Sequence, residues 1–273
     1  METRQAVRGD YAPVNGLDLY YETFGEGAPL ILLHGGFGAI EMFGPILPQL
    51  AAGRQVIGVD LQAHGRTADT DRPLRIELMA DDIAALIRHL NLGQADVMGY
   101  SMGGAVALQT AIRHPQVVRK LVVVSMPCRR SGWYPEVVEA MLQMGPEAAE
   151  PMKQSPVYQL YAAIAPRVED WPRLVGKMAD QLRQDYDWTQ DMAGIQAPTL
   201  LVSGDADGFP PQHAAEMFQL LGGGQRDGGW DGSDMSASQL AILPGTTHYN
   251  SCDSPLLPAI VTTFLDTPPP TAR

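Results

Sequence analysis

The alternation of short apolar strands with amphipathic helices predicts an α/β protein, with a mostly parallel central sheet and helices on both of its faces. Residues 30–33, 56–59 and 121–124 are continuous apolar runs, the pattern of strands buried on both sides of a parallel sheet. Residues 75–91 instead repeat their apolar positions at helical spacing, on one face. The two periods together exclude an all-helical or an all-strand fold.

The composition is that of a globular chain. Of 273 residues, 45% are hydrophobic and 18% are charged, which supplies enough apolar surface for a sizeable core. The 19 Lys+Arg and 31 Asp+Glu residues give a net charge of -12, which repels phosphate backbones and anionic lipid. We therefore expect no nucleic-acid partner and no membrane partner.

Targeting and redox signals are weak. The N-terminal sequence METRQAVRGDYAPVNG has no apolar segment of the kind found in signal peptides, and no run approaches the about 18 apolar residues of a membrane helix. Cys128 and Cys252 are too few for a disulfide framework, which favours reduced thiols. We expect a soluble, cytoplasmic protein, whose oligomeric state stays open, a homo-oligomer included.

The first elements in order are a hairpin and two buried strands. Asn15-Gly16 is a type I′ turn signal, and the apolar residues alternate after it. The strand at 30–33 ends in the glycine-rich segment 34–38, and the strand at 56–59 ends at Asp60. A helix at 75–91 and a strand at 95–98 follow. A helix reaching about Arg113 and the strand at 121–124 complete this half of the chain.

Residues 127–195 break the rhythm, because they contain helical patches and no buried strand pattern. We interpret them as a helical cap inserted into a core formed by residues 1–126 and 196–273. The strand pattern resumes at 199–202 and 240–243, with a glycine-rich surface loop, Gly222–Gly232, between them. A helix over about 255–265 ends the fold. The cap is expected over the carboxyl ends of the strands, where open α/β proteins bind ligands.

The pentapeptide Gly99-Tyr100-Ser101-Met102-Gly103 matches the pattern G-x-S-x-G between a strand and a helix. A turn this tight leaves no room for large side chains at its flanks, which explains the two glycines. It exposes the Ser101 hydroxyl at a helix N-terminus, where negative charge is favoured. We interpret Ser101 as a nucleophile; the simpler alternative is a helix-capping serine.

A serine nucleophile requires a base, and the base requires an acid that holds its tautomer. With a nucleophile elbow, the acid and then the histidine follow the serine along the chain. His248 lies in the loop after the last strand and is our candidate base, whereas His213 falls in a helix start and is expected on its surface. Asp205 and Asp207 both follow the penultimate strand, and spacing alone does not choose between them.

Backbone N–H groups are needed to stabilise the oxyanion of the transition state. The Met102 N–H, next to the nucleophile, is one candidate donor. The second is expected from the segment His34-Gly35-Gly36-Phe37, where glycines allow the backbone close to the substrate. His34 is expected to be a hydrogen-bonding structural residue and not a second base.

With these residues assembled, the chain resembles the α/β-hydrolase fold family over nearly its whole length. The segments that carry the resemblance are LILLHGG, VIGVDLQAHGRT, ADVMGYSMGGAVAL, APTLLVSGDAD and ILPGTTHYN. The resemblance implies that Asp207, the last residue of a G-x-x-D turn, is the acid, with Asp205 second. It also implies that Gly36 is the oxyanion residue, with Phe37 as the neighbouring alternative. Ala63 departs from the glycine that relatives often carry at that position.

The same resemblance excludes related chemistries. Haloalkane dehalogenases and epoxide hydrolases of this fold carry aspartate at the elbow, where this chain has Ser101. The chain has no H-E-x-x-H and no paired C-x-x-C, so no metal is expected. Gly35, Gly36 and Gly38 do not form a dinucleotide fingerprint, so no cofactor is expected either.

We therefore expect a carboxylesterase-type serine hydrolase that acts through an acyl-enzyme on small to medium apolar esters, with a small-molecule ester as its partner. The cap is expected to line the substrate pocket through Trp133, Tyr134, Tyr158, Tyr161, Met178 and Trp188. Cleavage of a lactone or of a carbon–carbon bond needs the same triad and is the alternative, with a perhydrolase side activity also conceivable. A non-catalytic small-molecule-binding protein is the alternative of another class, disfavoured because all three triad residues are present.

Overall fold

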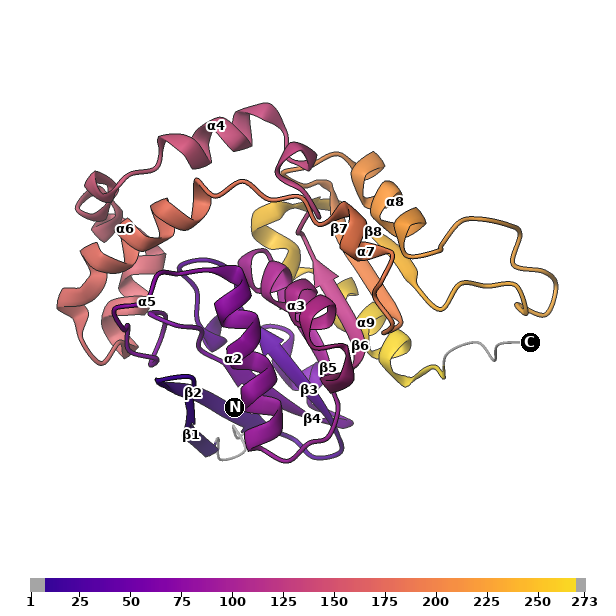
Figure 1. The fold of residues 1–273 in the computed structure, drawn as a ribbon, viewed down its shortest axis with the longest axis horizontal. Helices are drawn as coiled ribbons and strands as arrows, with labels where there is room; N and C mark the ends of the chain where they lie inside the picture. The colour runs from indigo at the N-terminus through magenta and orange to yellow at the C-terminus, as the bar shows by residue number, and fades with distance from the viewer. Residues whose placement is uncertain (1–7, 269–273) are drawn as a thin grey trace.

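The computed structural model describes residues 8–268, which contain an eight-stranded sheet in the order β1-β2-β4-β3-β5-β6-β7-β8 (Figure 1). The strands are β1 Arg8–Val14, β2 Leu17–Phe24, β3 Ala28–Leu33, β4 Arg54–Val59, β5 Ala95–Tyr100, β6 Val118–Val124, β7 Thr199–Ala206 and β8 Gln239–Thr247. The β1–β2 and β2–β4 pairs are antiparallel, and every other neighbouring pair is parallel. The predicted α/β class, with a mostly parallel sheet, is confirmed.

The antiparallel edge begins with the predicted hairpin. Asn15 has φ 48° and Gly16 has φ 81°, the two left-handed residues that a type I′ turn requires. This turn matches the right-handed twist of the strands that it joins, and it sets Val14 opposite Leu17.

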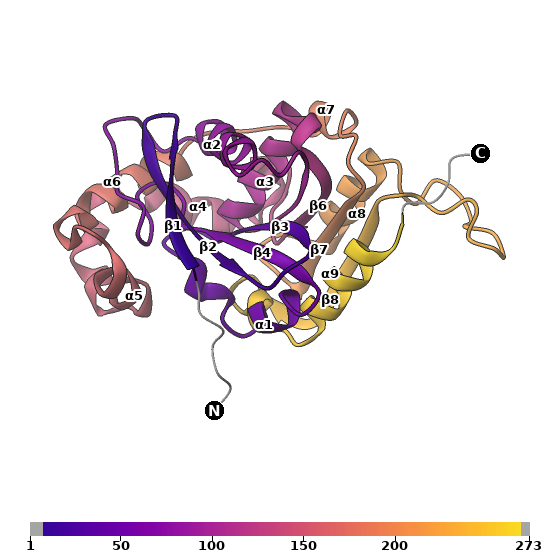
Figure 2. The same cartoon turned by 90° about the horizontal axis from the view of Figure 1, so that it is seen from below.

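Helices cover both faces of the sheet (Figure 2). The helices are α1 Leu47–Leu50, α2 Ile76–His89, α3 Met102–Arg113, α4 Pro135–Gln143, α5 Pro156–Ile164, α6 Trp171–Leu182, α7 Thr189–Met192, α8 Pro211–Leu220 and α9 Leu256–Asp266. Side chains alternate along each strand, so Ile31 packs in the cluster with α2, α3 and α8, whereas Leu30 packs in the cluster with α1 and α9. Among the described residues, no helix is both long enough and apolar enough to cross a bilayer.

Residues 127–195 join β6 to β7 and contain helices α4 to α7 without a named strand. Figure 1 shows α4, α5 and α6 arching over one end of the sheet. Trp171 is 1% exposed, and its Nε1–H donates to the Ala149 carbonyl at 2.8 Å. The buried side chains of this segment belong to the same apolar cluster as those of α2 and α3. The segment therefore packs on the sheet core and does not enclose a separate one.

An ionic contact ties α6 to the loop that follows β4. The Asp69 carboxylate is 2% exposed and lies 2.7 Å from both the Arg173 Nε and the Lys177 Nζ. Lys177 also donates to the Arg72 carbonyl at 2.7 Å. In the same loop Ala63 has φ 64°, a left-handed conformation that glycine adopts without strain, so the departure at this position leaves the turn intact.

Candidate active site

Ser101 stands on a strained turn between β5 and α3. Its φ of 52° and ψ of -119° lie outside the ordinary regions for an L-residue, as a nucleophile elbow requires. A Cβ on Gly99 would lie 1.9 Å from the Gly103 carbonyl oxygen, and one on Gly103 would lie 2.3 Å from the Leu33 carbonyl oxygen. Both flanking positions therefore exclude any side chain, which is the physical basis of the G-x-S-x-G pattern.

Three side chains far apart in the sequence form a hydrogen-bonded chain. The Ser101 Oγ lies 3.0 Å from the His248 Nε2, and the His248 Nδ1 lies 2.9 Å from the Asp207 Oδ1. Asp207 follows β7 and His248 follows β8, so parallel strands deliver both residues to the same edge of the sheet as Ser101. In this arrangement Nδ1 carries the proton donated to Asp207, and Nε2 is free to accept the serine proton.

The Asp207 carboxylate is fully buried and held ionised. Burial alone raises its pKa, but the hydrogen bond and charge of His248, with hydrogen bonds from Ser125 and the Gly208 N–H, outweigh burial and hold the pKa below its usual value. The Gly204 N–H also donates, at 3.2 Å. An acid that stays ionised holds the His248 tautomer over the working range of pH.

Ser125 is a site residue that the sequence analysis missed. It is fully buried at the end of β6, and its φ of 55° lies in the left-handed region that costs a non-glycine residue free energy. Its Oγ lies 3.0 Å from the Ser251 Oγ and donates to Asp207. The only sequence signal is a polar residue directly after the apolar run of β6, which parallels the position of Asp207 after β7.

The two rival residues lie elsewhere. Asp205 is exposed, and its Oδ1 accepts from the Thr246 N–H at 3.1 Å, which ties the end of β7 to the end of β8. The expectation that His213 lies on the surface is wrong, because this side chain is 3% exposed. Its Nδ1 lies 3.2 Å from Glu216 and its Nε2 lies 3.8 Å from the Cys128 Sγ. It occupies the seam between α8 and the start of the 127–195 segment.

The oxyanion candidates surround the nucleophile. Gly36, Phe37 and Met102 all line the cavity into which Ser101 opens. Within residues 8–268, the Phe37 and Met102 N–H groups are not seen donating to another protein group. Met102 is the first residue of α3, whose N-terminal dipole favours negative charge at this point.

Residues 35–38, the loop after β3 that holds Gly36 and Phe37, are called the oxyanion loop here. His34 and His64 lie beside this loop, and both side chains are fully buried. The His34 Nδ1–H donates to the Gly35 carbonyl at 2.7 Å, and its Nε2 accepts from the Leu61 N–H at 3.0 Å. Burial lowers the pKa of His34 to about 4. Burial, and next the charge of His34, lower the pKa of His64 to about 3. Both imidazoles are therefore neutral, and they pack side by side under the oxyanion loop with ring centroids 5.2 Å apart.

A cavity of about 640 Å³ opens over Ser101, between the sheet and the 127–195 segment. Five methionines contribute to its largely apolar wall: Met102, Met126, Met141, Met144 and Met178. Unbranched, polarizable methionine side chains adapt to ligands of different shape. The Met178 Cε lies 2.8 Å from the position that a Cβ on Gly36 would take, so Met178 closes the cavity beside the oxyanion loop.

Of the six pocket residues expected from the sequence, Trp133 and Met178 line this cavity. The other four require correction. Tyr158 and Tyr161 pack on Trp171, each with ring centroids 5.2 Å from it, and Trp188 packs on Tyr186 at 4.6 Å. Tyr134 is 38% exposed. Helical spacing shows that such side chains share a face, but it does not show which face meets the cavity.

Trp133 also contacts the candidate base. Its ring lies edge-on to His248 with centroids 5.4 Å apart, and its Nε1–H donates to the Tyr186 hydroxyl at 2.7 Å. This pair shields the His248–Asp207 hydrogen bond from water on the side of the 127–195 segment. Tyr186 and Arg130, neither of which is among the six expected pocket residues, line the same cavity.

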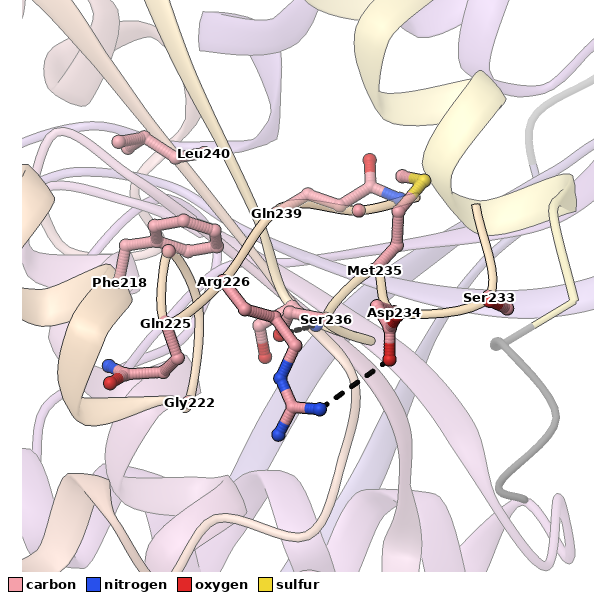
Figure 3. A pocket seen from close by; sticks show the side chains of 13 residues that line it. Phe218, Gly222, Gln225, Arg226, Ser233, Asp234, Met235, Ser236, Gln239 and Leu240 are labelled. Atoms are coloured by element: carbon pink, nitrogen blue, oxygen red, sulfur yellow. Dashed lines mark hydrogen bonds and ion pairs between the residues drawn. The ribbon is translucent and has the colours of Figure 1, made fainter. Parts of the chain in front are cut away.

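A second cavity, of about 700 Å³, lies under the glycine-rich loop after α8 (Figure 3). Arg226 crosses it to Asp234 at 3.5 Å. Gln239 and Leu240, the first residues of β8, form part of its wall, whereas His248 follows the other end of that strand. Nine residues at about 3.3 Å each separate the two ends by roughly 25–30 Å. The lining carries no histidine or cysteine within the described chain, so the chemistry is assigned to the first cavity.

Comparison with known proteins agrees with this geometry. The family model for the alpha/beta hydrolase fold matches residues 28–148. The chain is 30% identical over 217 residues to the AB hydrolase superfamily protein YisY of Bacillus subtilis, covering 71% of this chain and 79% of that protein. It is 29% identical over 223 residues to RutD of Azorhizobium caulinodans, provisionally named a carbamate hydrolase, covering 76% of this chain and 84% of RutD. For three further relatives, the alignment with this chain covers only about a third of the relative's own length.

Solved structures show the same fold. The crystal structure of E-2-(acetamidomethylene)succinate hydrolase superimposes with a TM-score of 0.74, covering 96% of this chain and 100% of that one. Sequence identity between the two is 21%, so this likeness concerns the fold alone.

Proposed function

Because the chain belongs to the α/β-hydrolase superfamily, we propose that it is a serine hydrolase that cleaves small to medium, largely apolar carboxylic esters through an acyl-enzyme. The hydrogen-bonded chain from Ser101 through His248 to Asp207, opening into an apolar cavity, carries this proposal. Relatives named as hydrolases support hydrolytic activity in general.

Acylation follows from the distances in the site. As the Ser101 Oγ attacks the carbonyl carbon, its proton passes to the His248 Nε2 at 3.0 Å. The carbonyl oxygen becomes an oxyanion beside the Met102 N–H and the N–H groups of Gly36 and Phe37; such a donor is worth about 3 kcal/mol or more. When this tetrahedral intermediate collapses, the bond between the carbonyl carbon and the alcohol oxygen breaks, and the alcohol oxygen takes the proton from His248. The ester is thereby split into an acyl-serine and a free alcohol.

Deacylation repeats these steps with water. His248 removes a proton from a water molecule as the water oxygen attacks the acyl carbon. His248 then returns that proton to the Ser101 Oγ. Asp207 stabilises the imidazolium in both halves of the cycle without changing its own protonation. The products are a carboxylic acid and the restored enzyme.

The 127–195 segment acts in this proposal as a cap that supplies the wall of the substrate cavity. Met141 lies in α4, Met144 at its C-terminal end, and Met178 in α6. Ser101 and His248 instead follow directly after strands β5 and β8. The cap also excludes water from the triad through Trp133.

Active-site labelling tests the proposal. A fluorophosphonate should add once to the protein, at Ser101, and Ser101→Ala should abolish both the adduct and the turnover of esters. Ser236→Ala, in the loop of the second cavity, is the matched control and should label as the parent does. A panel of aryl esters, lactones, carbamates and dicarbonyl compounds then ranks the bond types. Absence of any adduct, or an adduct that survives Ser101→Ala, refutes the nucleophile.

A further inference from the structure

Among the residues that the structure describes, the wall of the active-site cavity contains one arginine, Arg130, and no lysine. Arg130 lies in a short 3₁₀ turn shortly after β6, and its side chain is 14% exposed. The acidic groups in the same wall are Glu136, which is exposed, and Asp207, which is paired with His248. In a chain of net charge -12, a cation at this position needs an explanation.

The hydrogen bonds of Arg130 are incomplete. The Nη2 group donates to the carbonyls of Leu182 and Gln184, at the C-terminal end of α6. The Nε and Nη1 groups are buried and have no acceptor within the described chain. The nearest carboxylate, that of Asp185, is 3.6 Å from the Nε and 90% exposed. This guanidinium therefore has two buried N–H groups without an acceptor, and its ion pair is long and made to an exposed carboxylate, an arrangement that is costly beside an apolar wall.

A ligand carboxylate beside Arg130 would supply a closer negative charge and hydrogen-bond acceptors for the guanidinium. The side-chain amides of Gln181 and Gln184 line the same cavity and add further donors. The remaining wall is mainly methionine, tryptophan and aliphatic side chains, which suit an apolar chain between the two ends of the ligand.

We propose that Arg130 binds a carboxylate on the substrate, so that the preferred substrates are half-esters of dicarboxylic acids. Ser101 cleaves the ester at one end of an apolar chain while Arg130 holds the free carboxylate at the other. This assignment rests on the proposed serine-hydrolase function and specifies its substrate class.

The competing explanation is that Arg130 only caps α6, whose C-terminal carbonyls it bonds. Arg129 separates the two explanations. It is the adjacent cation, it pairs with Glu216 at 2.8 Å, and it does not line the cavity. Arg129→Gln therefore removes one positive charge from the same segment without changing the cavity wall.

The experiment compares each monomethyl ester of succinic, glutaric and adipic acid with its dimethyl diester, which keeps the chain length, removes the charge and adds one methyl group. Methanol release gives kcat and KM. For at least one chain length, the parent protein should prefer the half-ester at least tenfold in kcat/KM. Arg130→Gln should lower that kcat/KM at least tenfold, mainly through KM, and leave the diester within about twofold. Arg130→Lys should restore part of the loss, and Arg129→Gln should change neither.

The parent protein also provides a test that needs no variant. Free glutarate or adipate should inhibit it at concentrations at least tenfold lower than the monocarboxylate of equal chain length. Preference for the diester at all three lengths, or equal losses for both esters in Arg130→Gln, overturns the proposal and leaves Arg130 as a helix cap. If the fluorophosphonate labels Ser101 but no half-ester is preferred, only this inference fails. If Ser101 is not labelled, the proposed function itself fails.

Discussion

A substitution at His64 tests whether the buried imidazoles under the oxyanion loop are held neutral. Its imidazole is fully buried beside His34, and its Nε2 has no hydrogen-bond partner among residues 8–268. Its Nδ1 lies 2.8 Å from the Gln62 carbonyl oxygen, a contact that a glutamine amide can replace in His64→Gln. The substitution thus removes a titrating group and keeps a donor to that carbonyl.

The magnitude follows from the pKa of His64 in the two states. In the folded protein burial lowers this pKa to about 3, whereas an unfolded chain gives about 6.5. Below pH 6.5 the unfolded state therefore binds a proton that the folded state refuses. Stability that is fully present above pH 6.5 is lost as the pH falls towards 3. At 1.36 kcal/mol per pKa unit, the loss between pH 6.5 and 4.5 is about 2 kcal/mol for this one group.

The assay is urea unfolding at pH 7.5, 6.5, 5.5 and 4.5. Between pH 6.5 and 4.5 the parent protein should lose about 2 kcal/mol more than His64→Gln does. Exposed His89 provides the control, because His89→Gln should keep the pH dependence of the parent. Measuring the difference between variants cancels the contributions of Asp60 and Asp82, whose pKa values are raised by burial. Parallel curves for the parent and His64→Gln would show that His64 is not held neutral.

Three further substitutions test the site and the 127–195 segment. Ser125→Ala removes a hydrogen bond to the ionised Asp207, which is worth about 1.5 kcal/mol. The kcat should therefore fall about tenfold while KM stays within twofold, and the low-field NMR resonance of the His248 Nδ1–H should move. An unchanged kcat would contradict this prediction. Lys177→Met removes one of the two cations beside the buried Asp69 and leaves Arg173 and the Gln62 amide as its partners. A loss of about 2 kcal/mol should lower Tm by about 5 °C in calorimetry, whereas Lys153→Met, at an exposed pair, should not. Met178→Ala opens the cavity beside Gly36 and should raise kcat/KM for branched relative to straight acyl esters; an unaltered ratio places the acyl group elsewhere.

The predictable part of the site is local. The elbow could be recognised because its two glycines are required by backbone contacts within a single strand–turn–helix unit. The order of strands and helices could be recognised because burial on both sheet faces forces continuous apolar runs, as in residues 30–33 of β3, all of which are buried. Parallel strands end at one edge, so the loops that carry Asp207 and His248 were expected near Ser101.

The α/β class, the order of strands along the chain and the turn that carries Ser101 could thus be predicted without coordinates, because each depends on residues close together in the sequence. Folding was needed to place Asp207 and not Asp205 against His248, since the two aspartates lie two residues apart at the end of the same strand. Only the tertiary structure showed that Tyr158 and Tyr161 pack on Trp171 while Arg130 reaches the cavity wall. Helical periodicity defines a face, but which neighbour that face meets depends on contacts between residues far apart in the chain, and these form only on folding.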